Sequence, residues 1–162
     1  LREVLTLLSD QQKLHILQRE YNGWTPLQHA AFRDHTEIII TLLTSLQSPA
    51  YRLKQQTGDE YTPLHRAAWK GHTKSVKMIL DCLTADQQIQ LMSVQDWIGK
   101  TAIQYTELRG HTDTVRILRE YQHRADNLMR EEYSKLIIHI AHVCQCVRFM
   151  GINPYKLYSN IV

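Results

Sequence analysis

Three segments of this chain repeat one pattern, in which a short apolar helix is followed by a turn and a second helix. The clearest copy is residues 61–80, YTPLHRAAWKGHTKSVKMIL. A threonine followed by a proline, as at Thr62 and Pro63, is typical of a helix start. Gly71 can adopt the left-handed backbone conformation that ends a helix. The other copies are residues 24–43, WTPLQHAAFRDHTEIIITLL, and residues 100–118, KTAIQYTELRGHTDTVRIL.

The spacing of the three copies constrains the fold further. Their opening threonines, Thr25, Thr62 and Thr101, are 37 and 39 residues apart. Self-similarity at such a period indicates a solenoid of stacked units rather than one closed core. The pattern predicts helices over residues 26–33, 36–46, 63–70, 73–83, 102–109 and 112–124.

The segment from Thr62 to His72, TPLHRAAWKGH, closely resembles the ankyrin repeat, and the resemblance extends over roughly residues 20–120. It implies an all-α solenoid of stacked helix–turn–helix units with β-turn fingers between them, to which we add a C-terminal capping helix. We therefore divide the single domain, residues 1–162, into a truncated N-terminal repeat (1–19), three repeats (20–56, 57–95 and 96–124) and a C-terminal helical cap (125–162).

The segments before the first and third repeats have a common addition. Both contain Asp-Gln-Gln followed by apolar residues, and Asp10 and Asp86 each precede the next opening threonine by fifteen residues. We expect these two aspartates to cap an extra helical turn. This addition explains why the repeats exceed the ~33 residues of a standard ankyrin unit.

The chain after the third repeat contains no proline or glycine between residues 126 and 150. Its apolar residues fall at helical spacing, which predicts a separate amphipathic helix over residues 128–150. In the third repeat, Glu107 stands where the alanine pair is expected and Arg119 replaces a leucine, so a standard fourth repeat should be obstructed. We expect the helix to cap this end and to bury, against Ile117 and Leu118, the residues Leu136, Ile140, Val143 and Val147.

Composition excludes several classes of function. The net charge is only +3 and the basic residues are scattered, which argues against nucleic-acid binding. No apolar run approaches the ~20 residues that cross a bilayer, so we expect no membrane insertion of this segment. Three cysteines form no disulfide framework, which favours a cytoplasmic location, with the nucleus as the alternative. The chain begins at Leu1 without a signal segment, and we take it as a fragment.

Histidine is a common catalytic and metal-binding residue, and this chain contains nine. His35, His65, His72 and His111 recur at fixed repeat positions, where hydrogen bonding to backbone and threonine groups is the expected role. No nucleophile and base accompany them, so we expect no enzyme and no cofactor. His139, His142 and Cys146 lie on one side of a helix and could hold zinc, but Cys144 does not and the spacing matches no standard finger. We expect no metal, and zinc binding is the least favoured alternative.

The surface residues point to partner binding. In ankyrin repeats the fingertips and the two residues before the turn glycine vary freely, and here the latter place an apolar column beside a basic one. The resemblance implies a protein–protein interaction module, and this face suits an acidic partner segment with interspersed apolar residues. We expect a monomer; the alternative function is a structural spacer in a larger scaffold or channel. The expected partner-binding residues are Trp24, Phe32, Arg33, Tyr61, Trp69, Lys70, Trp97, Lys100, Leu108 and Arg109.

Overall fold

The structure, a computed structural model, describes residues 3, 7–45 and 60–149. The chain divides into two compact units, Leu1–Ala125 and Asp126–Val162. The described residues contain helices and no strand, apart from two isolated bridges, Tyr21 with Trp24 and Gln95 with Thr101. The all-α prediction is therefore confirmed. No helix within the described ranges is both long enough and apolar enough to cross a membrane.

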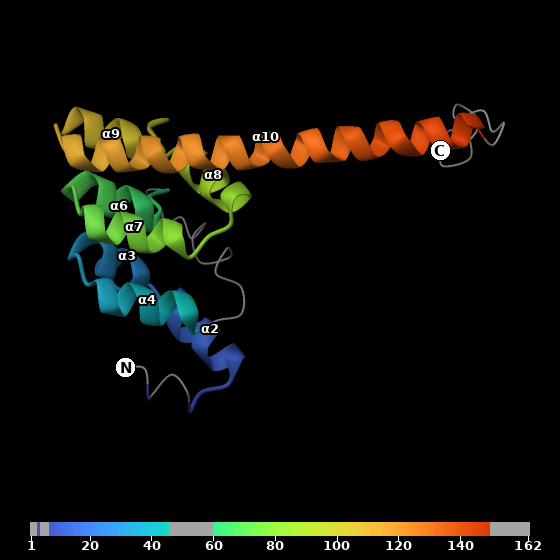
Figure 1. Ribbon diagram of the computed structural model, residues 1–162. Helices are drawn as coiled ribbons and strands as arrows, with labels where there is room; N and C mark the ends of the chain where they lie inside the picture. The colour runs from blue at the N-terminus through green and yellow to red at the C-terminus, as the bar shows by residue number, and fades with distance from the viewer. Residues whose placement is uncertain (1–2, 4–6, 46–59, 150–162) are drawn as a thin grey trace. The chain divides into compact units, whose positions relative to one another are not determined.

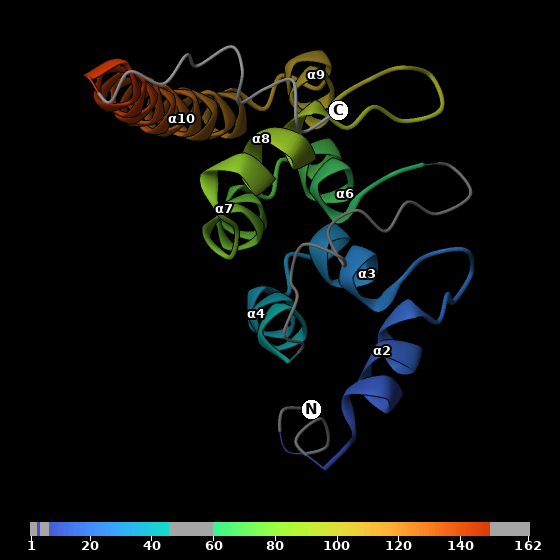
Figure 2. The same ribbon diagram turned by 90° about the vertical axis from the view of Figure 1, so that its right-hand side faces the viewer.

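Helix pairs stack to form the first unit (Figure 1). The pairs are α3 (Pro26–Phe32) with α4 (Thr36–Thr44), α6 (Pro63–Lys70) with α7 (Thr73–Asp81), and α9 (Ala102–Leu108) with the start of α10 (Thr112–Phe149). Figure 2 shows α3, α6 and α9 in one layer and α4 and α7 in another. The first five of these helices start where the sequence predicts and end within two residues of the predicted ends.

Alanine pairs let the inner helices α3 and α6 approach closely. Ala30, Ala31, Ala67 and Ala68 are almost completely buried where α3 packs on α6. A methyl side chain keeps the two backbones close, and the outer helices then supply the larger core residues. These fully buried residues are Ile39 on α4 and Val76, Ile79 and Leu80 on α7.

Two short helices make up the additions, α2 (Asp10–Gln18) and α8 (Ala85–Ser93). Their caps are Ser9 and Thr84, so the prediction that Asp10 and Asp86 cap them was wrong. A cap needs extended backbone and a side-chain oxygen that accepts from the third helical N–H, and Ser9 and Thr84 meet both conditions. Asp86 instead lies in the first turn of α8, where a negative charge favours the positive end of the helix dipole.

One continuous helix replaces the two predicted near the C-terminus. α10 runs from Thr112 to Phe149 without interruption, because no proline or glycine ends it. The expected burial is also wrong for Leu136 and Ile140, which are 52% and 48% exposed. The side chains of Val143 and Val147 lie outside the described part of the chain. The assignment of residues 125–162 as a cap stays a prediction, and Leu136 and Ile140 give it no support.

Candidate binding face

Each of the inner helices α3 and α6 holds the finger of the following repeat through one side chain. The His65 ring accepts from the Thr62 N–H at Nδ1, at 3.2 Å, so Nε2 carries the proton and donates to the Lys100 carbonyl at 3.1 Å. Gln28 stands at the same position of the first repeat, and its amide donates to the Tyr61 carbonyl at 2.5 Å. The glutamine therefore replaces the histidine without loss of the link between repeats.

A second set of histidines fixes the ends of the inner helices. His72 contacts the Phe32 carbonyl at 3.0 Å, and His111 contacts the Trp69 carbonyl at 3.2 Å, both through Nε2. These bonds confirm the expected structural role of His72 and His111. The bonds of His65 to Thr62 and Lys100 confirm the same role for His65. They also fix the backbone that carries two of the expected binding residues, Phe32 and Trp69.

Aromatic rings and an arginine form a stack across the repeats. The Arg66 guanidinium lies 3.9 Å from the centre of the Trp24 ring and 4.3 Å from that of Tyr61. The Tyr105 ring continues the stack, with its centroid 5.6 Å from Tyr61 and 5.1 Å from Trp69. The contact between Arg66 and Tyr61 lies within the second repeat. The other three contacts join neighbouring repeats, so the stack spans all three.

The predicted apolar and basic columns interleave with this stack. Lys70 places its Nζ 4.5 Å from the Phe32 ring, and Arg109 places its guanidinium 3.8 Å from the Trp69 ring. Each cation therefore covers an aromatic ring of the preceding repeat, a favourable arrangement because the ring face is electron-rich. We call this set the aromatic–cation stack; its members are Trp24, Phe32, Tyr61, Arg66, Trp69, Lys70, Tyr105 and Arg109.

Six of the ten expected binding residues belong to the stack, and the other four do not. Lys100 acts through its backbone, since its carbonyl accepts from His65 and its N–H donates to Asp96 at 2.8 Å. Trp97 at the tip of the third finger is 67% exposed, and Leu108 is 65% exposed. Arg33 is exposed on the first repeat.

Sequence reasoning missed Arg66 and Tyr105, although both are buried members of the stack. They occupy one repeat position, between the capping-box residue and the alanine pair, and His29 occupies it in the first repeat. The His29 ring lies 5.1 Å from Trp24, so this position faces the stack in every repeat. The signal was a third column of large polar or aromatic side chains at the repeat period.

Asp96 is another missed residue, and it ties the third finger to the stack. Its carboxylate accepts from the backbone N–H groups of Ile98, at 3.0 Å, and of Lys100, at 2.8 Å. It also accepts from the Tyr105 hydroxyl, which in turn accepts from the Tyr61 hydroxyl at 2.8 Å.

Two pKa values follow from this network. Burial alone raises the pKa of Asp96, but the hydrogen bonds from Tyr105, Lys100 and Ile98 outweigh it and hold that pKa below its usual 3.8. Burial, together with the hydrogen bonds to Asp96 and Tyr61, raises the pKa of Tyr105 far above its usual value. Asp96 is thus a buried carboxylate with its acceptors used, rather than a general base.

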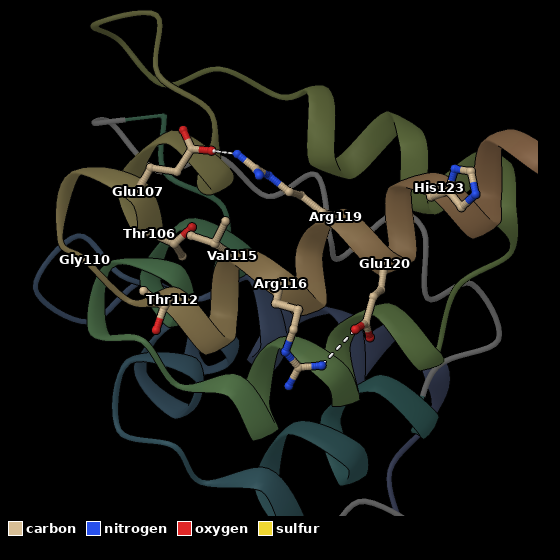
Figure 3. Close-up of a pocket in the computed structure, with 9 residues that line it drawn as sticks. All are labelled: Thr106, Glu107, Gly110, Thr112, Val115, Arg116, Arg119, Glu120 and His123. Carbon is tan, nitrogen blue, oxygen red and sulfur yellow. Dashed lines mark hydrogen bonds and ion pairs between the residues drawn. The ribbon is translucent and has the colours of Figure 1, made fainter.

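The C-terminal end of the stacked repeats carries a groove of about 660 Å³ between α9 and α10 (Figure 3). Glu107 and Arg119, the two residues expected to obstruct a fourth repeat, form an ion pair of 2.8 Å across it. Arg116 and Glu120 form a second pair of 2.8 Å on α10. Both pairs are exposed, so they contribute little stability. They do make this end charged where the earlier repeats present alanines.

The structure gives no support for zinc binding by His139, His142 and Cys146. His139 and His142 are exposed on α10, and the side chains of Cys144 and Cys146 lie outside the described residues. Within the described part of the chain, no three histidine, cysteine or acidic side chains gather closely enough to hold a metal ion.

Comparison with known proteins identifies the family of the first repeats. The family model for ankyrin repeats (3 copies) matches residues 2–91, which are 90 of the 162 residues. Comparison with curated proteins gives no significant match. The match ends before α9, but the third repeat keeps the Thr101 capping box and the His111 contact to the preceding repeat. Ankyrin repeats are generally protein–protein interaction modules. From the motif, the stacked helix pairs and the matched family model, the chain belongs to the ankyrin repeat family.

Proposed function

We propose that this chain binds a protein partner along the aromatic–cation stack and catalyses no reaction. The observation that carries the proposal is the continuity of the stack, which connects Trp24 in the first repeat to Arg109 in the third through ring and cation contacts. Tryptophan, tyrosine and arginine are the residues enriched at binding hot spots. A partner that lies along the inner helices meets all three repeats at once.

The chemistry of the stack favours an acidic partner segment with large apolar side chains. Lys70 and Arg109 are exposed, whereas Arg66 is buried between two rings. The exposed cations can donate hydrogen bonds to carboxylates of the partner, while Trp24 and Trp69 remain partly exposed for apolar contact. The preorganised rings lose little conformational freedom on binding, which favours affinity. We place this interaction in the cytoplasm, with the nucleus as the alternative.

A spacer role in a larger scaffold or channel is the second candidate. One observation favours it: the cations already contact rings of their own chain, as Lys70 does with Phe32 and Arg109 with Trp69. Such contacts hold neighbouring repeats together without any partner. A spacer would show no specific ligand that depends on these side chains.

Selection from a displayed peptide library, followed by affinity measurement, tests the proposal. We expect acidic segments with interspersed aromatic or aliphatic residues to be enriched on the wild-type chain. The Trp69→Ala/Lys70→Glu variant should bind the selected peptide at least about 30-fold more weakly, since truncating a hot spot costs ~2 kcal/mol. The loss from Lys70→Glu alone should shrink as salt rises, because it acts mainly on charge-steered association.

The matched control is Lys77→Glu, the same charge reversal at an exposed position of α7. It should leave the affinity within about threefold of wild type, because it lies on the outer helix layer. If no peptide is enriched, or if the Trp69→Ala/Lys70→Glu variant binds a selected peptide as tightly as wild type, the spacer role is the better description.

A further inference from the structure

Two cations of the aromatic–cation stack lie on aromatic rings of the preceding repeat. The Lys70 Nζ is 4.5 Å from the centre of the Phe32 ring, and the Arg109 guanidinium is 3.8 Å from that of Trp69. Both cations are exposed, and both rings are only partly buried. A partner side chain that stacks on the same face of either ring must therefore displace the cation first.

Arg66 makes similar contacts but is held in place. Its guanidinium lies between the rings of Trp24, at 3.9 Å, and Tyr61, at 4.3 Å, and the residue is only 9% exposed. Lys70 and Arg109 each lie on a single ring, and no acidic side chain in the described ranges forms an ion pair with either of them. A contact between a cation and a ring is weak at an exposed position, so these two cations are able to leave their rings while Arg66 is not.

A carboxylate offers each of these exposed cations a stronger partner than the ring does. Hydrogen bonds between charged groups are about twice as strong as those between neutral groups, and a guanidinium can bind a carboxylate through two of them. A partner that brings a carboxylate close to Lys70 or Arg109 therefore draws the cation off its ring and opens the ring face. An uncharged apolar segment has to break the same contact without this compensation.

We propose that Lys70 and Arg109 act as removable covers, which admit to the Phe32 and Trp69 rings only a segment with a carboxylate beside each apolar side chain. These two residues then determine specificity, rather than only attracting an acidic partner. The inference rests on the partner binding proposed above and deepens it. It also accounts for the contacts within the chain that favour a spacer role, since a cover must rest on its ring when no partner is bound.

NMR of the arginine and lysine side chains tests whether the covers move. The ring current of the aromatic group beneath them should shift the side-chain proton signals of Lys70 and Arg109 upfield in the free chain. Titration with a short polyglutamate peptide, which has carboxylates and no apolar group, should remove most of this shift. Arg33 is the internal control, because it occupies the same repeat position, is exposed and covers no ring among the described residues. Signals of Lys70 and Arg109 that match those of Arg33 in the free chain, or an upfield shift that persists at the end of the titration, would overturn the proposal.

Binding of a neutral peptide separates a removable cover from a fixed one. The peptide selected on the wild-type chain is remade with glutamine and asparagine in place of its acidic residues. It should bind Lys70→Ala/Arg109→Ala at least about fivefold more tightly than wild type, because two weak cation–ring contacts no longer have to be broken. The acidic peptide should bind the same variant more weakly, and Arg33→Ala should give the neutral peptide no gain.

The two experiments keep the covers distinct from partner binding itself. A neutral peptide that binds the double variant no more tightly than wild type would overturn the covers and leave partner binding intact. The NMR titration needs no selected peptide, so it decides whether the covers move even if the library selection enriches nothing.

Discussion

Replacing Gly71 with alanine should lower the free energy of unfolding by about 3 kcal/mol, the largest effect that we expect from a single methyl group here. Gly71 ends α6 with φ of +70°, a conformation that costs an alanine ~1–2 kcal/mol. A β-carbon at this position would also lie 2.6 Å from the His111 ring. That ring cannot move freely, because its Nε2 contacts the Trp69 carbonyl at 3.2 Å.

Gly110 provides the matched control for this change. It has nearly the same φ, +71°, but a β-carbon there meets no atom within 4 Å. Gly110→Ala should therefore lose only the ~1–2 kcal/mol of backbone strain. Urea unfolding of the two variants separates the contact with His111 from the strain. Equal losses would mean that the His111 ring moves aside at no cost and that the turn does not lock the repeats together.

The repeats were predictable because their signals are local. A threonine before a proline, as at Thr62, and a glycine after the alanine pair, as at Gly71, act through the backbone within a few residues. A residue that can adopt the left-handed conformation of the turn glycine also preserves the turn. Asp34 replaces the turn glycine with φ of +57°, and its carboxylate accepts from the Ser75 hydroxyl of the next repeat at 2.6 Å. Neither its position nor its conformation required the full structure to be inferred.

The stack was only partly predictable because it depends on the offset between repeats. The ring of Trp24 and that of Tyr61 come from different fingers, and Arg66 reaches both only because the second repeat is set against the first. The sequence revealed the columns of Phe32 and Trp69 but not that the cation of the next repeat would cover each ring. Side-chain direction across a repeat interface is a property of stacking, which no local pattern encodes.

The length of α10 could not be inferred for a different reason. Proline and glycine mark where a helix ends, but their absence leaves the end open. The prediction placed a break near residues 124–128, but no residue there ends the helix. The exposure of Leu136 and Ile140 shows that apolar residues at helical spacing need not be buried against the repeats.

Asp96→Ala should destabilise the chain by about 2–4 kcal/mol, because it leaves three donors without their acceptor. These are the Tyr105 hydroxyl and the N–H groups of Ile98 and Lys100, and the Tyr105 side chain is only 2% exposed. Asp96→Asn should lose less, since its carbonyl oxygen can still accept from both backbone groups. Urea unfolding at neutral pH measures both losses, and Tyr105→Phe, which removes a single donor, serves as the matched comparison.

The ionised state of Asp96 gives this prediction a pH dependence. Its pKa is lowered in the folded chain below the 3.8 of the unfolded chain, so the unfolded state takes up a proton first as the pH falls. The stabilisation by the carboxylate is complete above about pH 4 and is lost as the pH falls through the folded pKa. The difference in unfolding free energy between wild type and Asp96→Asn should therefore shrink between neutral pH and about pH 3. A difference that does not change over this range would show that the hydrogen bonds from Tyr105, Ile98 and Lys100 do not depend on the charge of Asp96.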